Sequence, residues 1–118
     1  MSNLPTQETI FEKILKGEVE CSKVYEDQQV LAFNDINPQA PTHIVLIPKS
    51  KLARLTASEE AHKELLGHMT WAAGEIARQK QLHKGWRLVV NDGEEAGQAV
   101  PYLHFHILSG RQLLWPPG

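Results

Sequence analysis

Two histidines lie two residues apart in the segment Tyr102–Leu108, whose other members are mostly apolar. This pattern favours a β-strand, and side chains alternate across a strand, so Tyr102, His104 and His106 are expected on one face. A neutral imidazole has a free ring nitrogen near neutral pH, so it can attack phosphorus or move a proton for a neighbour. The same rings can bind zinc, with His43 as a third ligand, or serve the structure only. The pair alone leaves these roles open.

A short helix and a hairpin are predicted in the first third of the chain. Thr9 and Glu12 have the spacing of a capping box, and Gly17 is placed to end the helix. Strands are expected at Ser22–Glu26 and Val30–Asn34, joined by a polar three-residue turn. Together these elements form the amino-terminal edge of the predicted sheet.

The rest of the chain supplies three more strands and a longer helix. Thr56 and Glu59 also have capping-box spacing and predict a helix that runs to about Gln81. Its inner face is expected to carry apolar residues at helical spacing, namely Leu65, Leu66, Met69, Ala72, Ala73 and Ile76. Strands at His43–Ile47 and Trp86–Val90 precede the one that carries the histidine pair. Five strands and two helices with short connections predict an α+β fold with an antiparallel sheet.

Length and composition bound the class of protein. The chain has 118 residues, of which 42% are hydrophobic and 22% charged, and this composition suits a single globular domain. The domain is expected over residues 9–118, including the carboxy-terminal tail, and residues 1–8 are expected to form a flexible tail. A net charge of −2 without a basic stripe argues against a nucleic-acid partner, and no apolar run is long enough for a membrane span. The single cysteine, Cys21, is expected to be a buried thiol, and a cytoplasmic location is expected.

Several further motifs accompany the histidine pair. They are Phe33–His43, Ile47–Lys49, Val89–Gly93, Gly97–Gln98, Gly110–Gln112 and Trp115–Gly118. Their order, over nearly the whole chain, resembles the histidine triad (HIT) family, in its branch of histidine triad nucleotide-binding proteins, the purine nucleoside phosphoramidases. The resemblance implies a homodimer in which two five-stranded sheets join, a purine nucleotide bound by each protomer, and a reaction that uses neither a cofactor nor a metal.

The resemblance also implies roles for individual polar residues. His104 would be the nucleophile that becomes nucleotidylated, His106 would contact the phosphate, and His43 would orient the nucleophile or balance charge. Asp35 would accept the two ribose hydroxyls, since one carboxylate has two oxygens to match a cis-diol. Asn91 would contact the ribose and phosphate region.

The remaining matches describe the base slot, the phosphate loop and the carboxy terminus. The base is expected between apolar side chains, namely Ile10, Phe11, Ile14, Phe33 and Ile36. The backbone N–H groups of Gly97 and Ala99 are expected to approach the phosphate, as a glycine-containing turn allows. Trp115 is expected to reach the site of the partner protomer.

Two positions depart from the family pattern. Tyr102 stands where the family has the first histidine of the triad, and Ala99 stands where it has a serine. Tyr102 still offers a backbone carbonyl to hold the His104 ring, and the lost serine hydroxyl is worth about 10²-fold in rate if it acts in the transition state.

Three functions are therefore weighed. The first is hydrolysis of purine nucleoside 5′-phosphoramidates, such as adenosine 5′-monophosphoramidate, through a nucleotidyl-His104 intermediate. The second is a catalytically weak module that binds purine nucleotides. The third is zinc binding through His43, His104 and His106.

Overall fold

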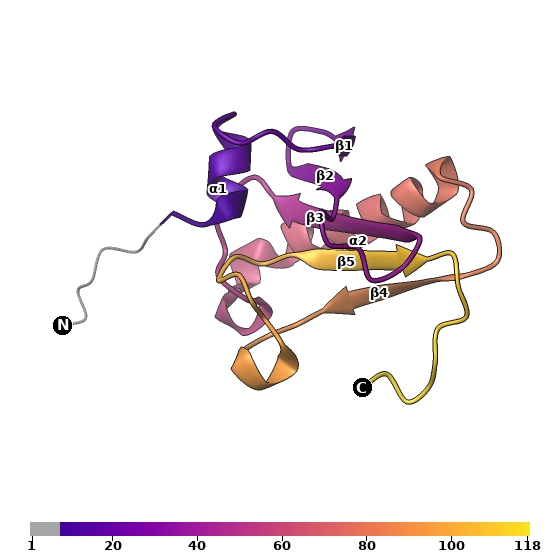
Figure 1. Ribbon diagram of the computed structural model, residues 1–118. Helices are drawn as coiled ribbons and strands as arrows, with labels where there is room; N and C mark the ends of the chain where they lie inside the picture. The colour runs from indigo at the N-terminus through magenta and orange to yellow at the C-terminus, as the bar shows by residue number, and fades with distance from the viewer. Residues whose placement is uncertain (1–7) are drawn as a thin grey trace.

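The computed structural model describes residues 8–118 and shows a five-stranded sheet with a helix against each face (Figure 1). The helices are α1 (Ile10–Leu15) and α2 (Lys63–Gln79). The strands are β1 (Lys23–Glu26), β2 (Val30–Asn34), β3 (Thr42–Pro48), β4 (Trp86–Val90) and β5 (Phe105–Ser109). They lie in the order β1-β2-β3-β5-β4, and every neighbouring pair is antiparallel. The predicted α+β fold is confirmed, whereas the predicted tail, apart from Glu8, lies outside the described residues.

Alternation along the central strands divides the core into two halves. One half includes Ile44 and Leu46 of β3, which pack with Met69 and Ile76 of α2. The other half lies on the α1 side and consists of Phe11, Leu31, Phe33, Val45, Ile47 and Tyr102. Since His43 shares a strand face with Val45, the imidazole of His43 belongs to the α1 side of the sheet.

The first helix is held at both ends as predicted. The Thr9 side chain accepts the backbone N–H of Glu12, and the Glu12 carboxylate accepts the backbone N–H of Thr9, so the capping box is present. Gly17 follows the helix with φ of +78°, a conformation that glycine adopts without strain. These ends confine α1 to six residues, three of which, Ile10, Phe11 and Ile14, were predicted to contact a base.

The predicted start of the long helix is wrong. The Thr56 N–H donates to Asp92 Oδ2 at 2.8 Å, so it ties this segment to the loop after β4 instead of opening a helix. Thr56 itself lies in a single turn of 3₁₀-helix, Leu55–Ala57. A second such turn, Glu60–His62, comes next, and α2 begins only at Lys63. Its predicted inner face is confirmed, since Met69, Ala72, Ala73 and Ile76 are fully buried and Leu65 and Leu66 pack against them. No described helix is both long and apolar enough to span a membrane.

The last strand is shorter than predicted and begins at Phe105. Pro101 has no N–H, the Tyr102 N–H donates to the Val100 carbonyl, and the Leu103 N–H donates to the Leu52 carbonyl. These groups are therefore absent from the ladder, which starts where Phe105 pairs with both β3 and β4. The predicted alternation of faces nevertheless extends through Leu103 and Tyr102, which pack into opposite halves of the core.

Candidate active site

A cavity of about 630 Å³ opens on the α1 side of the sheet. Its lining includes twelve of the thirteen residues that were predicted for the site, namely His43, His104, His106, Asp35, Asn91, Ile10, Phe11, Ile14, Phe33, Ile36, Gly97 and Ala99. The thirteenth, Trp115, is 81% exposed in the tail after β5 and does not line this cavity. One chain therefore gathers every predicted side chain except the one assigned to the partner protomer.

Strand register brings His43 and His106 together. Val45 of β3 pairs with His106 of β5, which places His43, two residues before Val45 on the same face, diagonally across from His106. The His43 Nε2 and His106 Nδ1 atoms are 2.8 Å apart, a hydrogen-bond distance. His43 and His106 therefore act as one linked pair across two strands.

His104 lies just before β5 and is oriented by the backbone. Its Nδ1 is 2.7 Å from the Tyr102 carbonyl oxygen, which can only accept, so Nδ1 carries the hydrogen. The opposite ring nitrogen, Nε2, is left with a lone pair. The centroid of the Phe11 ring lies 5.0 Å from that of the His104 ring, with an angle of 69° between the ring planes. The centroid of the His106 ring lies 4.9 Å from that of His104. This tautomer makes His104 Nε2 a nucleophile.

In the neighbouring pair, His43 and His106, each ring carries its hydrogen on Nε2 instead of Nδ1. The Gln39 N–H donates to His43 Nδ1 at 3.0 Å, so the neutral His43 ring carries its hydrogen on Nε2. That Nε2–H donates to His106 Nδ1, with Asp35 Oδ2 at 3.4 Å as a further acceptor. His106 in turn carries its hydrogen on Nε2. The cavity thus presents a lone pair on His104 and an N–H donor on His106.

The backbone around Gln39 is itself held from the carboxy-terminal tail. The Arg111 guanidinium donates to the Gln39 carbonyl through Nε at 3.2 Å and Nη2 at 3.1 Å. The same residue, Gln39, thus accepts from Arg111 and donates to His43. A chain of contacts runs from the tail to His106 and sets the tautomer of each imidazole on the way.

Burial lowers the pKa of all three histidines, which keeps them neutral at pH 7. For His106, burial and the positive charge that His104 and His43 would carry hold the pKa at about 4. Burial also lowers the pKa of His104 and of His43, and the Asp35 carboxylate opposes the shift in each case. A neutral His104 is the nucleophilic form, so this electrostatic setting favours attack at neutral pH.

The lowered histidine pKa values predict a loss of stability in mild acid. Unfolded histidine has a pKa of about 6.5, so below that pH the unfolded chain binds more protons than the folded one. The free energy of unfolding should therefore fall as the pH is lowered from about 7 towards 4, as urea titrations at several pH values will measure. His106→Asn should flatten this dependence, whereas His83→Asn, at an exposed position outside the cavity, should keep the wild-type slope. Equal slopes for the wild type and His106→Asn would contradict the prediction.

The loop between β4 and β5 offers backbone donors, though not the pair that was expected. Gly97, at φ of +89°, donates its N–H to the Glu94 carbonyl at 3.0 Å and so closes a turn. Ala99 and Val100 also line the cavity, and no group in residues 8–118 accepts a hydrogen bond from their N–H groups. The backbone donors that this loop leaves free at the cavity are therefore the N–H groups of Ala99 and Val100.

Comparison with known proteins agrees with this geometry. A family model described as the HIT domain matches residues 16–113. The chain belongs to the HIT family. It is 50% identical to a maize protein named 14 kDa zinc-binding protein, over the whole of this chain and 94% of that one. Its fold is that of HIT family hydrolases, such as one from Legionella pneumophila with 42% identity, a TM-score of 0.91, and coverage of 94% of this chain and 100% of that chain.

A nucleotide-binding member of the HIT family also shares the fold. It is the histidine triad nucleotide-binding protein of Candida albicans, with 28% identity, a TM-score of 0.78, and coverage of 92% of this chain and 83% of that chain.

Three carboxylate and imidazole groups of this HIT domain approach the geometry of a metal site. Ligand atoms of Asp35, His43 and His106 all lie within 4.8 Å of one another, so Asp35 takes the place that the zinc alternative gave to His104. The Gln39 N–H, however, keeps the hydrogen of His43 on Nε2, the atom that would face the metal. The donor set therefore does not fit zinc unless the His43 ring turns over and gives up its bond to Gln39.

Sequence reasoning missed part of the cavity wall. Three residues of the connection between α1 and β1 also line the cavity, and no periodicity in the sequence marks them: Val19, Glu20 and Cys21. Cys21 was expected to be buried but is half-buried on this wall, where burial raises the pKa of its thiol. Gln39 was also missed, although its place in a proline-rich loop four residues before His43 indicated a fixed backbone.

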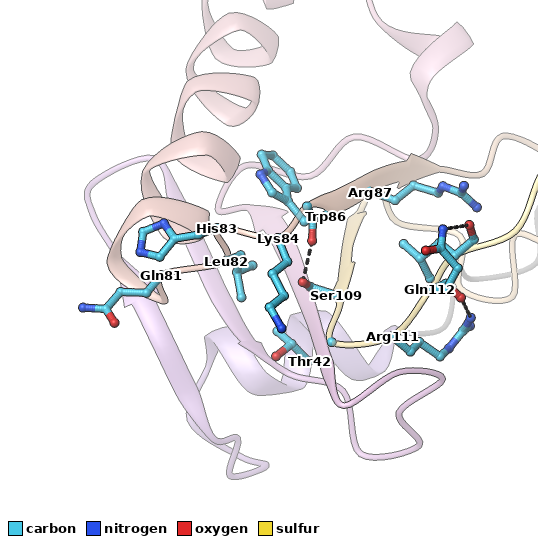
Figure 2. Close-up of a pocket in the computed structure, with 13 residues that line it drawn as sticks. Thr42, Gln81, Leu82, His83, Lys84, Trp86, Arg87, Ser109, Arg111 and Gln112 are labelled. Atoms are coloured by element: carbon cyan, nitrogen blue, oxygen red, sulfur yellow. Dashed lines mark hydrogen bonds between the residues drawn. The ribbon is translucent and has the colours of Figure 1, made fainter.

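A second cavity, of about 740 Å³, lies at the other end of the sheet, where β4 begins and β5 ends (Figure 2). Its lining includes Lys84, Arg87 and Arg111 but no carboxylate. Arg87 donates to the Leu114 carbonyl at 3.0 Å, which holds the tail near the start of β4. His43, His104 and His106 do not line this cavity, and its one histidine is His83.

Proposed function

We propose that this HIT protein hydrolyses purine nucleoside 5′-phosphoramidates through a nucleotidyl-His104 intermediate. The observation that carries the proposal is the His104 tautomer, in which the Tyr102 carbonyl takes Nδ1–H and leaves the Nε2 lone pair in the cavity. The His106 N–H donor beside it suits a phosphate oxygen. A site with an aligned nucleophile and an adjacent donor is suited to displacement at phosphorus.

The proposed reaction has two steps. In the first, the His104 Nε2 lone pair forms a bond to the α-phosphorus while the bond from phosphorus to the amine nitrogen breaks. The departing nitrogen keeps the electron pair and takes a proton from water, because burial holds His106 neutral and able only to donate a hydrogen bond. In the second, water attacks the phosphorus, its proton goes to solvent, and His104 leaves with its lone pair restored. The Tyr102 carbonyl stabilises the ring while it is positively charged.

The rest of the cavity fits a purine nucleotide. Phe11 and Phe33 are buried, with ring centroids 5.8 Å apart, and Ile10 and Ile36 lie exposed at the opening, where a flat base would cover them. Asp35 Oδ1 accepts a hydrogen bond from the Asn37 N–H at 2.8 Å. This bond fixes the carboxylate at the place assigned to the ribose hydroxyls. These groups order base, ribose and phosphate along one path that ends at His104.

Incubation with an adenosine 5′-phosphoramidate that carries a fluorogenic amine tests the proposal. We expect amine release, together with an acid-labile nucleotide adduct on the protein, with or without a chelator. Tight binding of adenosine monophosphate without amine release would overturn it in favour of the binding module. Loss of activity and of the thermal transition on chelation would instead favour zinc, the ligand in the maize relative's name.

We further infer that two copies join through β4. This strand has a single neighbour, β5, and every residue in it is half-buried or exposed. Val90, Leu114 and Trp115 add exposed apolar surface, of the kind that an edge strand usually covers by pairing. Pairing of two β4 strands would make one sheet of both copies, and Trp115 is then expected to reach the partner's cavity.

Light scattering coupled to gel filtration measures this association. The expected mass is about twice 13.3 kDa, and Val90→Glu, which places a charge on the edge, should shift the protein towards the monomer. A wild-type protein that elutes as a monomer at micromolar concentration would contradict the inference.

A further inference from the structure

The nucleophile depends on one peptide group that lies outside the sheet. The carbonyl of the Tyr102–Leu103 peptide accepts the His104 Nδ1–H at 2.7 Å. The N–H of the same peptide donates to the Leu52 carbonyl at 2.6 Å. Because β5 begins only at Phe105, no strand ladder fixes this peptide. Its orientation, and with it the direction of the His104 ring, must come from other contacts.

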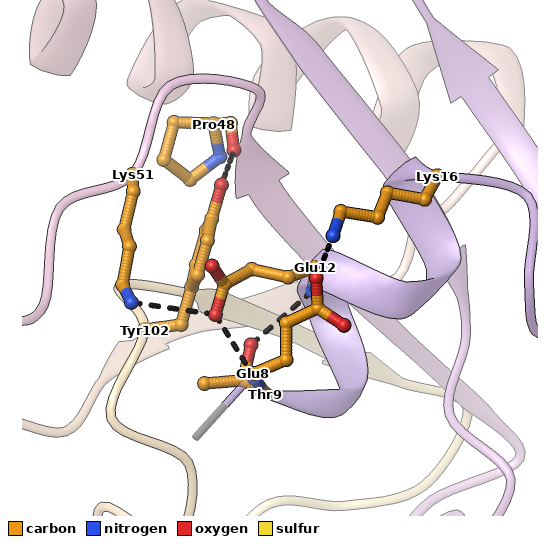
Figure 3. Close-up of polar contacts among 7 residues, drawn as sticks. All are labelled: Glu8, Thr9, Glu12, Lys16, Pro48, Lys51 and Tyr102. Atoms are coloured by element: carbon orange, nitrogen blue, oxygen red, sulfur yellow. Dashed lines mark hydrogen bonds and ion pairs between the residues drawn. The ribbon is translucent and has the colours of Figure 1, made fainter. Parts of the chain in front are cut away.

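The Tyr102 side chain provides the second anchor. It is completely buried, and its hydroxyl donates to the Pro48 carbonyl at 2.5 Å (Figure 3). The Phe11 ring meets the Tyr102 ring edge-on, with centroids 5.9 Å apart. Burial raises the pKa of Tyr102 to about 12, so the hydroxyl stays protonated and remains a donor. One tyrosine is thus held at its ring, at its hydroxyl and, through the next N–H, at its backbone.

Both carbonyl acceptors lie in residues 48–52, which comprise the last residue of β3 and the four residues after it. The same segment also holds α1, because Lys51 Nζ lies 3.4 Å from Glu12 Oε1, the carboxylate oxygen that accepts the Thr9 N–H (Figure 3). Tyr102 therefore lies where the helix of the base slot, the 48–52 segment and the nucleophile meet.

We propose that Tyr102 is a positioning residue for His104, whose hydroxyl bond to Pro48 sets the peptide carbonyl that aims His104 Nε2 at the α-phosphorus. The kinetic part of this inference rests on the proposed function. The structural part concerns the ligand-free protein and stands independently of turnover. A tyrosine that only filled the core would contribute to stability without controlling the His104 ring.

Tyr102→Phe separates these roles, because it keeps the ring and removes only the hydroxyl. Tyr25→Phe is the matched control, since Tyr25 is the other tyrosine and its hydroxyl bonds to Asp27 at 3.0 Å, outside the cavity. We expect Tyr102→Phe to slow formation of the nucleotidyl adduct at least tenfold, with the Kd for adenosine monophosphate within about twofold of the wild type. Tyr25→Phe should leave both quantities unchanged. Melting curves will restrict the assays to temperatures at which each variant is folded.

Nitrogen-15 NMR of the imidazoles in the ligand-free protein gives the readout that core filling would not move. The wild type should show His104 as the Nδ1–H tautomer, with a slowly exchanging ring proton, and Tyr102→Phe should broaden or lose that signal. The proposal would be overturned if Tyr102→Phe kept the imidazole spectrum of the wild type and formed the nucleotidyl adduct at the wild-type rate. A rapidly exchanging His104 ring proton in the wild type would overturn it without any variant. If the wild type shows the fixed tautomer but no turnover, the proposed function fails and the positioning role is retained.

Discussion

His104→Gln is expected to reduce turnover of an adenosine phosphoramidate by at least about 10³-fold, because the step that forms the covalent intermediate loses its nucleophile. Glutamine places an amide in the space of the imidazole, so packing against the Phe11 ring is largely retained. The amide nitrogen has no lone pair suited to attack phosphorus. Affinity for adenosine monophosphate should stay within a few-fold of the wild type, since base and ribose contacts lie elsewhere in the cavity.

The measurement pairs steady-state kinetics with mass spectrometry of the acid-labile adduct. His83→Gln is the matched control, because His83 is exposed and does not line the cavity around His104. It should retain wild-type turnover and adduct. Persistent turnover in His104→Gln, or an adduct on another histidine, would remove His104 from the role of nucleophile.

Asp35→Asn is expected to weaken nucleotide binding by about 10- to 100-fold, the loss typical of a charge-assisted hydrogen bond replaced by a neutral one. Asparagine keeps an oxygen for the Asn37 N–H, which Asp35 Oδ1 accepts at 2.8 Å, so the loop should retain its conformation. The lost element is the negative charge beside His43, which the proposed function assigns to the ribose hydroxyls. Calorimetry with adenosine monophosphate measures the change.

A comparison with 2′,3′-dideoxyadenosine 5′-monophosphate shows whether the hydroxyls are what Asp35 binds. The wild type should lose affinity for the dideoxy nucleotide, whereas Asp35→Asn should bind both nucleotides about equally, a non-additive result that indicates direct contact. Additive losses would place the ribose elsewhere.

Local signals in the sequence predicted most of the sheet and all of α1. The capping box at Thr9 and Glu12 and the glycine at Gly17 bound α1 within the chain itself, so no distant residue was needed to predict it. Thr56 has the same capping pattern, yet its N–H bonds to Asp92, 36 residues away, and no local pattern reports such a contact. The start of β5 was misplaced for the same reason, because Leu52 takes the Leu103 N–H.

The sequence predicted which residues form the site, but it did not predict the hydrogen bonds that orient them. Alternation placed His104 and His106 on one face, and the family resemblance supplied Asp35, Asn91 and the apolar wall. The tautomers depend instead on Gln39 and Tyr102, whose backbone groups contact imidazoles at distances that only the folded loops define. Backbone donors and acceptors leave no trace in residue type, so a single sequence does not reveal them.

The six-residue helix α1 lines the cavity through Ile10, Phe11 and Ile14, and helices much shorter than about 12 residues are not stable in water on their own. This helix is held by the Thr9 and Glu12 cap, the Lys51 ion pair and the buried Phe11 ring, and not by intrinsic helicity. Its amide hydrogens should exchange with deuterium well before those of the 17-residue α2, and a bound nucleotide should slow them. If the proposed function holds, the measured nucleotide affinity will include the free energy of ordering this single short helix.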